Sequence, residues 1–315
     1  MINLSRHREP DHDDLYYPRS AKELLIRLHA LRPDVVHVHL GGNIFIREAA
    51  LFFALARRAG VVNVLTFHSG GYPSSSEGKR ATPRSFRGLA FRQLDAIIGV
   101  NNQLIDVFAR YGVRKDRVHM IEPFSRDIDR EAINAEGLSP LLADFAAKHS
   151  PLLLAVGLLE PEYGLDVQLQ AMSAIRREFP NAGLLIVGSG TLHQSLQQKI
   201  DEHPESAHVL LAGDVPRPKT LALIARANLL LRTTHFDGDA LSVREALALG
   251  TRVLATDNGM RPAGVQLLRT LEPDALAQAI GPALKYEPPV AEFSSTKPDP
   301  IDQVISLYEQ LVTRK

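Results

Sequence analysis

The chain contains 315 residues, of which 45% are hydrophobic and 23% are charged, and this is the composition of a globular protein long enough for two domains. Its 36 basic residues balance its 36 acidic residues, so the charge gives no support to bulk binding of nucleic acid, which needs a basic excess. The lack of cysteine excludes disulfides, thiolate metal ligands and thiol nucleophiles.

In the first part of the chain, short apolar runs alternate with amphipathic segments. The runs are continuously apolar rather than alternating, as expected for strands that helices cover on both faces. They predict strands at residues 34–39, 62–67, 95–100 and 117–121, and the segments between them predict helices at residues 21–31, 47–58 and 103–111.

A second set of the same kind follows a linker at residues 124–150, which includes a helical piece at residues 141–148. A proline-rich stretch, residues 287–300, then interrupts the pattern before a last predicted helix at residues 301–312. The predicted strands of this set are residues 152–156, 183–187, 208–212, 228–232 and 252–255, and its helices are residues 165–178, 191–200, 219–227 and 241–249.

Alternation of strand and helix predicts parallel sheets with right-handed crossovers. We therefore expect an α/β protein with two Rossmann-like α/β/α domains that face each other across a cleft. The expected domains are residues 1–124 and 125–290. The segment 291–315 is expected to end in a helix that packs back on the first domain.

The most informative stretch is residues 232–262, which reads RTTHFDGDALSVREALALGTRVLATDNGMRP. A strand ends near Arg232, a polar turn follows, and a helix begins near Leu241, with Asp237 or Asp239 available to cap it. The helix would begin at the carboxyl edge of a parallel sheet, where its free backbone N–H groups suit a diphosphate.

This stretch resembles the retaining glycosyltransferases of family 4, which have the GT-B fold. They carry an acidic residue, seven intervening residues and a glutamate that begins a pattern like EALAxGxPVVATD. Asp237 and Glu245 have this spacing, and EALALGTRVLATD starts at Glu245. The resemblance implies that Glu245 holds the ribose hydroxyls of the nucleotide and that Asp237 lies near the donor sugar. Weaker matches, such as RPDVVHVH at residues 32–39, extend along most of the chain.

The loop expected to grip the donor diphosphate departs from this family. Many members carry a basic pair in a GRxxxxKG-like loop, but Leu158 and Tyr163 occupy those positions after Gly157. A diphosphate in a low-dielectric cleft needs compensating charge. We hypothesise that arginines of the motif stretch supply it, and the alternative for Arg244 is that it only covers its helix. The candidates are Arg232, Arg244 and Arg261.

Further residues complete the expected donor site. The turn that contains Gly188 and Gly190 lets the backbone approach a phosphate, although it lacks the third glycine of a dinucleotide fingerprint. Asp239 and Ser242, at the start of the motif helix, are also candidates for donor binding. Asp237 and Asp239 form a DxD like that of metal-dependent transferases, but two carboxylates make an incomplete octahedral site. We expect no metal and no cofactor beyond a nucleotide sugar.

The first domain is expected to be shortened. The chain begins close to the strand that RPDVVHVH forms in the family, so the strand at residues 34–39 would be an exposed apolar edge that a partner chain completes. His68 follows the strand at residues 62–67, and the resemblance implies that it reaches the donor sugar. The alternative is a loop histidine that the backbone satisfies.

Residues 77–92 are basic and apolar in turn. Lys79, Arg80, Arg84 and Arg87 flank large apolar side chains, which suggests a peripheral contact with a membrane surface. The alternative is a solvated helix face or an acceptor loop. Because no apolar run approaches the ~18–20 residues that span a bilayer and the polar start lacks a signal peptide's core, we expect a cytoplasmic protein, with this contact at the inner membrane face.

Together, these features lead us to expect retaining, metal-independent transfer of a sugar from a nucleoside-diphosphate sugar to a hydroxyl of a glycan or lipid-linked acceptor. Two alternatives stay open. The shortened first domain and the lost basic pair would suit a non-catalytic or partner-dependent relative. A nucleotide-sugar epimerase of similar fold is compatible with the element order but fits the stretch at residues 232–262 less well.

Overall fold

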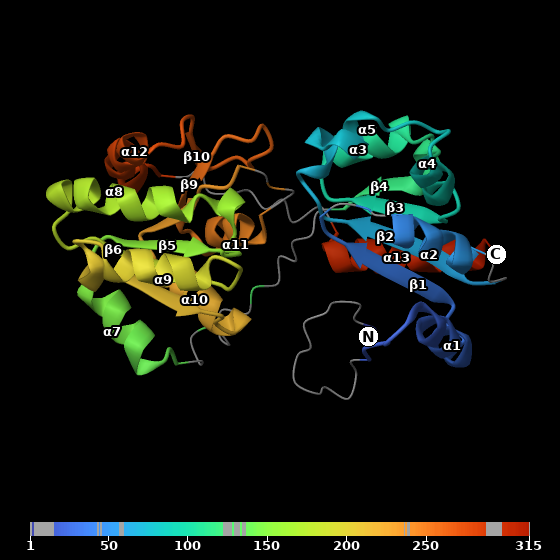
Figure 1. Ribbon diagram of the computed structural model, residues 1–315, viewed down its shortest axis with the longest axis horizontal. Helices are drawn as coiled ribbons and strands as arrows, with labels where there is room; N and C mark the ends of the chain where they lie inside the picture. The colour runs from blue at the N-terminus through green and yellow to red at the C-terminus, as the bar shows by residue number, and fades with distance from the viewer. Residues whose placement is uncertain are drawn as a thin grey trace.

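A computed structural model describes residues 2, 16–42, 44, 46–56, 60–121, 128, 133, 137–235, 237, 240–287 and 298–314. The described chain forms two lobes, each built on a parallel sheet of its own (Figure 1). The fold is that of two Rossmann-like α/β units, as the alternation of strand and helix predicts.

The first lobe has a four-stranded sheet in the order β1-β2-β3-β4. Its elements, in chain order, are α1 (Ala21–Leu31), β1 (Val35–Leu40), α2 (Ile46–Ala56), β2 (Val62–Phe67), η1 (Tyr72–Ser74), α3 (Ser76–Lys79), α4 (Phe86–Phe91), β3 (Ala96–Gly99), α5 (Asn102–Arg110), η2 (Lys115–Arg117) and β4 (Val118–Met120).

The second lobe has a six-stranded sheet in the order β10-β9-β8-β5-β6-β7. Its elements are α7 (Pro140–Lys148), β5 (Leu152–Val156), η3 (Pro161–Tyr163), α8 (Leu165–Glu178), β6 (Gly183–Val187), α9 (His193–Asp201), η4 (Ser206–His208), β7 (Val209–Gly213), α10 (Arg217–Arg226), β8 (Leu229–Arg232), α11 (Leu241–Leu249), β9 (Arg252–Thr256), β10 (Val265–Leu268) and α12 (Pro273–Lys285). The last helix is α13 (Pro300–Thr313).

Helices cover both faces of the second sheet, which is why its strands are apolar at every position. Along β5, Leu153 packs into the cluster formed with α8, α9 and α12, whereas Leu152 and Leu154 pack into the cluster formed with α7, α10 and α11. Alternate side chains of a strand point to opposite faces, so a strand between two helical layers needs apolar residues throughout.

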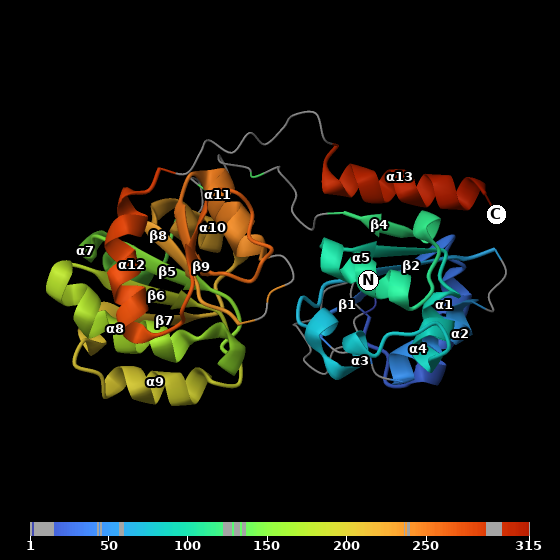
Figure 2. The ribbon, with the colours of Figure 1, turned by 90° about the horizontal axis from the view of Figure 1, so that it is seen from above.

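The first sheet is covered by helices that come from both ends of the chain. Leu65 and Phe67 of β2 pack with α2, α4 and α5, whereas Val62 and Val64 face α13, whose Leu307 is buried among them. Figure 2 shows α13 lying along the first lobe, although it follows the second lobe in sequence. Burial of Leu307 and its neighbours therefore ties the end of the chain to the first sheet.

The predicted strands are all present, each within one residue of the expected bounds, and the predicted helices are within two. Apart from the short 3₁₀ helices η1 to η4, four of the described elements were missed. The helices α3 and α4 are short, β10 has only four residues, and α12 contains Gly281 and Pro282, which disfavour a helix locally. Tertiary packing overrides this preference, since Leu276 and Ile280 of α12 are buried in the core beside α8.

The strand β1 lies at one edge of the first sheet within the described residues. Its apolar side chains are nevertheless packed, because Val36 and Val38 contact a buried cluster that includes Leu24 and Leu28 of α1. The apolar side chains of this edge are therefore less exposed than the sequence predicts. None of the described helices is long and apolar enough to cross a membrane.

Candidate functional site

The order of the second sheet locates a candidate site. From β5 the chain winds to β6 and β7 on one side, whereas β8, β9 and β10 add to the other side. Open α/β sheets bind ligands at the carboxyl ends of the two strands between which the winding direction changes. Here these strands are β5 and β8, which are direct parallel neighbours. The loops that begin at Gly157 and Thr233 leave the sheet at this point.

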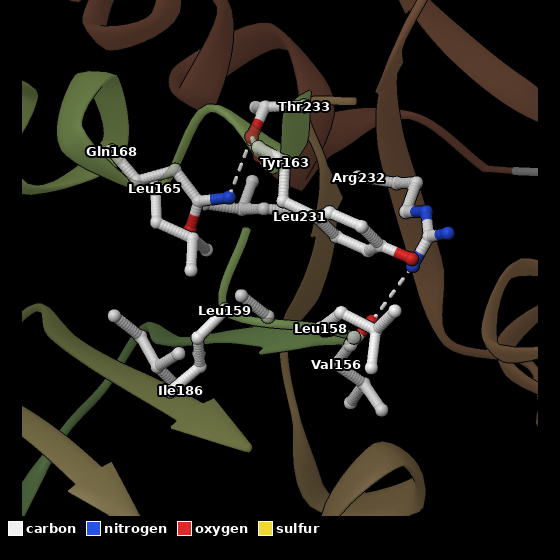
Figure 3. A pocket seen from close by; sticks show the side chains of 12 residues that line it. Val156, Leu158, Leu159, Tyr163, Leu165, Gln168, Ile186, Leu231, Arg232 and Thr233 are labelled. Atoms are coloured by element: carbon white, nitrogen blue, oxygen red, sulfur yellow. Dashed lines mark hydrogen bonds between the residues drawn. The ribbon is translucent and has the colours of Figure 1, made fainter. Parts of the chain in front are cut away.

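A cavity lies between these two loops (Figure 3). Its empty volume, open solvent included, is about 240 Å³. Tyr163 fills part of this space. Its ring lies under the guanidinium of Arg232, 4.8 Å from Cζ to the ring centre, and its Cε1 atom would be 2.4 Å from a Cβ atom placed on Gly157. Any other residue at this position would require Tyr163 or Arg232 to move.

Three charged side chains form a buried cluster behind the cavity. Asp237 accepts hydrogen bonds from Nε and Nη2 of Arg232 at 3.0 and 3.2 Å, and from Nη1 of Arg261 at 2.7 Å. The exposed fractions of the three side chains are 10% for Arg232, 8% for Asp237 and 4% for Arg261. Two buried cations thus share the carboxylate of Asp237.

Backbone oxygens hold the two guanidinium groups in place. Arg232 donates to the carbonyl of Val156 at 2.9 Å, and Arg261 donates to the carbonyl of Thr256 at 3.0 Å. Burial would raise the pKa of Asp237, but the charges and hydrogen bonds of the two arginines outweigh it and hold that pKa below its usual range. Asp237 is therefore ionised at neutral pH and orients both cations.

The second acid of the motif is also buried and ion-paired. Oε1 of Glu245 accepts hydrogen bonds from Nη2 and Nε of Arg217 at 2.8 and 3.2 Å. Only 6% of the Glu245 side chain is exposed, against 58% for Arg217. Burial raises the pKa of Glu245, and the guanidinium of Arg217 opposes this rise. A buried carboxylate is thus paired with a cation whose side chain is more than half exposed.

Ser242 lies one helical turn before Glu245, on the same face of α11. Its hydroxyl oxygen is buried and has no hydrogen-bond partner within the described part of the chain. A buried unpaired hydroxyl costs about 1–3 kcal/mol, so its presence calls for an explanation, and a missing ligand is one such explanation.

The glycines of the candidate site have packing roles as well. A Cβ atom on Gly188 would lie 1.8 Å from the carbonyl oxygen of Gly157, and one on Gly190 would lie 2.5 Å from that of Leu159. Gly188 also has φ +138°, which favours glycine. These residues therefore let the loops after β5 and β6 contact each other. The sequence predicted instead that this turn lets the backbone approach a phosphate.

The structure corrects the expected helix cap as far as Asp237 is concerned. The N-cap residue of α11 is Ala240, without a side-chain cap, and the carboxylate of Asp237 is bound to arginines. Arg244 is half-buried on the first turns of this helix. Asp239 lies outside the described residues. His68 is in the other lobe, at the end of β2, so the described contacts do not join it to the residues above.

Arg217 is a site residue that was not predicted from the sequence. It is the first residue of α10 and lies 28 positions before its partner, so no local motif connects the two. The signal available was the turn PRPK after a strand, which places a cation at the carboxyl edge of the sheet. Gln168 was missed too; its amide donates to Thr233 at 2.7 Å, while its buried carbonyl oxygen has no partner among the described residues.

Comparison with protein-family models gives two matches. Residues 143–285 match a family described as glycosyl transferases group 1, and residues 3–123 match a glycosyl transferase 4-like domain. The boundary between the two matches falls at residues 123–143, where the sequence predicts the linker.

Two of the curated relatives of similar sequence are bacterial enzymes. The chain is 25% identical to a glycogen synthase of Mycobacterium tuberculosis over 72% of its own length and 53% of that protein. It is also 25% identical to a GDP-mannose-dependent α-(1-6)-phosphatidylinositol monomannoside mannosyltransferase of Mycolicibacterium smegmatis, over 75% of its own length and 64% of that protein. The chain thus spans about half to two thirds of these relatives.

Solved structures share the fold at low sequence identity. Anabaena Alr3699/HepE in complex with UDP and glucose matches with a TM-score of 0.71 and 16% identity, over 95% of this chain and 86% of that one. Staphylococcus aureus TarM matches with a TM-score of 0.62 and 14% identity, over 92% of this chain and 57% of that one.

Proposed function

Because the chain belongs to the family 4 glycosyltransferases of GT-B fold, as the matches over both lobes show, we propose that it transfers a sugar from a nucleoside-diphosphate donor to a hydroxyl acceptor, with retention at the anomeric carbon and without a metal ion. The bond from C1 of the sugar to the diphosphate breaks, and the acceptor oxygen bonds to C1 on the same face. The acceptor's proton passes to the leaving phosphate.

The observation that carries this proposal is the buried charge at the switch point of the second sheet. Arg232 and Arg261 bring two buried guanidinium groups to this point, where both pair with Asp237, and the N-terminus of α11 lies nearby. A positive field of this kind stabilises a leaving diphosphate as its charge develops. Arg232 and Arg261 thus replace the basic pair that Leu158 and Tyr163 displaced, and Arg244 on the same helix adds to them.

The remaining site residues take roles around the nucleotide. Glu245 holds the ribose hydroxyls, and the unpaired hydroxyl of Ser242 beside it gives the nucleotide a further hydrogen bond. Arg217 releases Glu245 on binding, since its exposed side chain can turn toward the phosphates. The turns at Gly157 and Gly188 keep the backbone close to the ligand. His68 contacts the sugar from the first lobe.

Transfer of the sugar tests this proposal directly. The chain is incubated with UDP-glucose, GDP-mannose or ADP-glucose, with and without a chelator, and the anomeric proton of the released or transferred sugar is followed by NMR. We expect turnover of one donor, resistance to the chelator and an α-configured first product. Glu245→Ala should abolish the reaction, whereas Glu202→Ala, at an exposed position of the same lobe, should not. A β-configured first product or no turnover of any donor would contradict the proposal.

A second candidate, a non-catalytic relative, is favoured by one observation. Tyr163 covers the glycine turn and Asp237 occupies both buried arginines, so a donor must displace one of them. The variant Tyr163→Ala separates the two functions. In a transferase it should retain or strengthen nucleotide binding, because it opens the cavity over Gly157. In a non-catalytic relative neither the variant nor the original chain should bind a nucleotide.

We propose that the first lobe, which would hold the acceptor, contacts a membrane surface that carries anionic lipid. On α4, Phe86 is 45% and Leu89 is 42% exposed, and Lys79, Arg80 and Arg84 are exposed nearby in the chain. Arg87, which the sequence reading grouped with them, instead donates to the carbonyl of Ile44 at 2.7 Å and fastens α4 to the segment before α2. A lipid-linked acceptor would suit this arrangement.

Sedimentation with vesicles tests the contact. We expect the chain to bind vesicles with anionic lipid and not neutral ones, and Phe86→Ser with Leu89→Ser to abolish binding. Leu141→Ser, at a 63% exposed position of the other lobe, is the matched control and should leave it unchanged. Equal vesicle binding by the double variant and by Leu141→Ser would contradict the proposed membrane contact.

A further inference from the structure

Three histidines gather at the carboxyl ends of β1 and β2 in the first lobe. His37 and His39 alternate along β1 and so lie on one face of the strand, with ring centres 4.2 Å apart. Nδ1 of His39 lies 3.1 Å from Nε2 of His68, and the planes of these two rings are within 17° of parallel. The distance and the near-parallel planes are those of a hydrogen bond between two imidazole edges.

The cluster is anchored from two sides. Nε2 of His37 is 2.7 Å from the hydroxyl of Thr66 on β2, and its Nδ1 contacts the hydroxyl of Tyr308 on α13. Thr66 is buried, and α13 is held by the burial of Leu307 against β2. His37 is thus fixed by its own sheet and by the last helix. Because the ring of His39 packs on that of His37, the position of the His39 ring is defined as well.

The three rings are neutral at ordinary pH. Burial lowers the pKa of His37 to about 4, helped by the charges of His39 and His68. His39 and His68 are exposed, but the loss of water where their rings pack together lowers the pKa of His39, and this desolvation together with the charge of His39 lowers that of His68. Among the described residues, the titratable side chains that contact the cluster are these histidines and Tyr308 of α13, and none of them adds a negative charge at neutral pH.

Two neutral imidazoles that share a hydrogen bond hold one proton between the facing nitrogens. If His39 carries it on Nδ1, Nε2 of His68 accepts and the outer nitrogen of His68, Nδ1, is a donor. If His68 carries it on Nε2, its outer nitrogen is an acceptor. Gly41 and Gly42, which follow β1, are exposed, and a Cβ atom on either would meet no atom within 4 Å.

We propose that His39 is a positioning residue that fixes the tautomer of His68, and so determines whether His68 offers a donor or an acceptor to a hydroxyl of the sugar. The hydrogen bond between the two rings carries this inference. The contact of His68 with the sugar rests on the proposed function, whereas the coupling of the two tautomers does not.

The test uses ¹⁵N NMR of the histidine rings in the full chain at neutral pH, where chemical shifts distinguish the two tautomers. In the original chain we expect one tautomer of His68. His39→Phe keeps a ring beside His37 but removes the nitrogen, and it should give a mixture of tautomers at His68. His39→Asn returns a polar atom near the position of Nδ1 and should restore a single tautomer. Identical His68 tautomers in the original chain and His39→Phe would overturn the inference.

Transfer kinetics provide a second arm. His39→Phe should lower kcat about tenfold, the equivalent of one oriented hydrogen bond, and should leave the Kd of the nucleoside diphosphate unchanged, because the nucleotide binds in the other lobe. A change in Kd with an unchanged kcat would contradict the positioning role. If the original chain transfers no sugar while the tautomers still respond to His39, the proposed function fails and the coupling stands.

Discussion

Replacing Asp237 by asparagine should destabilise the second lobe strongly. The side chain is 8% exposed and pairs with two arginines that are 10% and 4% exposed, so Asp237→Asn removes a buried carboxylate that two buried cations share. Removing one partner of a buried ion pair costs about 3–5 kcal/mol. In a lobe of this size, the loss corresponds to a fall of roughly 10 °C in the unfolding midpoint.

The experiment is thermal and urea unfolding of the full chain, followed by circular dichroism. The matched control is Asp166→Asn, which removes the carboxylate of an exposed ion pair with Lys199 in the same lobe and should cost less than about 1 kcal/mol. Pyrophosphate should restore part of the loss in Asp237→Asn, because the anion takes the place of the carboxylate between Arg232 and Arg261.

The pH dependence of unfolding, compared between the original chain and Asp237→Asn, gives the sign of the electrostatic effect. The pKa of Asp237 is lower in the folded state than in the unfolded state, so its stabilisation is present above the unfolded value of about 4 and is lost as pH falls through the folded value. The difference between the original chain and Asp237→Asn should therefore shrink in acid. A loss below about 1 kcal/mol at neutral pH would refute the reasoning on the buried cluster.

Three further predictions follow from single contacts. Gly188→Ala should cost more than about 3 kcal/mol in urea unfolding, because its Cβ would meet the oxygen of Gly157 at 1.8 Å, whereas Gly213→Ala, at φ +69° with no atom within 4 Å, should cost about 1 kcal/mol; equal losses would exclude the packing argument. Because the pKa of His37 falls to about 4 on folding, stability should drop as pH is lowered from about 6.5 to 4, and His37→Gln should flatten that slope in unfolding measured across this window; an unchanged slope would count against burial of a neutral ring. Arg217→Gln should weaken binding of a nucleoside diphosphate about tenfold in calorimetry and that of the nucleoside less, and an equal effect on both would remove the phosphate role of this arginine.

Much of the fold could be predicted because the strands of both sheets are buried on two faces. Such strands need apolar residues at every position, and runs such as residues 152–156 and 183–187 are bounded as predicted. The helix α12 escaped prediction because Gly281 and Pro282 oppose a helix locally, and only its burial beside α8 outweighs them.

The candidate site was predictable in its location but not in its contacts. The spacing of Asp237 and Glu245 is local and lies on one motif, so the sequence placed both acids at the carboxyl edge of the sheet. The partners that fix their charge come from distant segments. Arg217 is 28 residues from Glu245, and Arg261 is 24 residues from Asp237. Pairings at this range depend on the order of strands, which no periodicity reveals.

The central claim is that the second lobe binds a nucleoside diphosphate through Glu245 and the buried arginines. Calorimetric titration of the chain with UDP, GDP and ADP, with and without a chelator and repeated on Glu245→Ala, tests it most directly. We predict that one nucleotide binds, that the chelator does not change its Kd, and that the variant does not bind it. Absence of binding by all three nucleotides, or equal binding by the original chain and Glu245→Ala, would contradict the account.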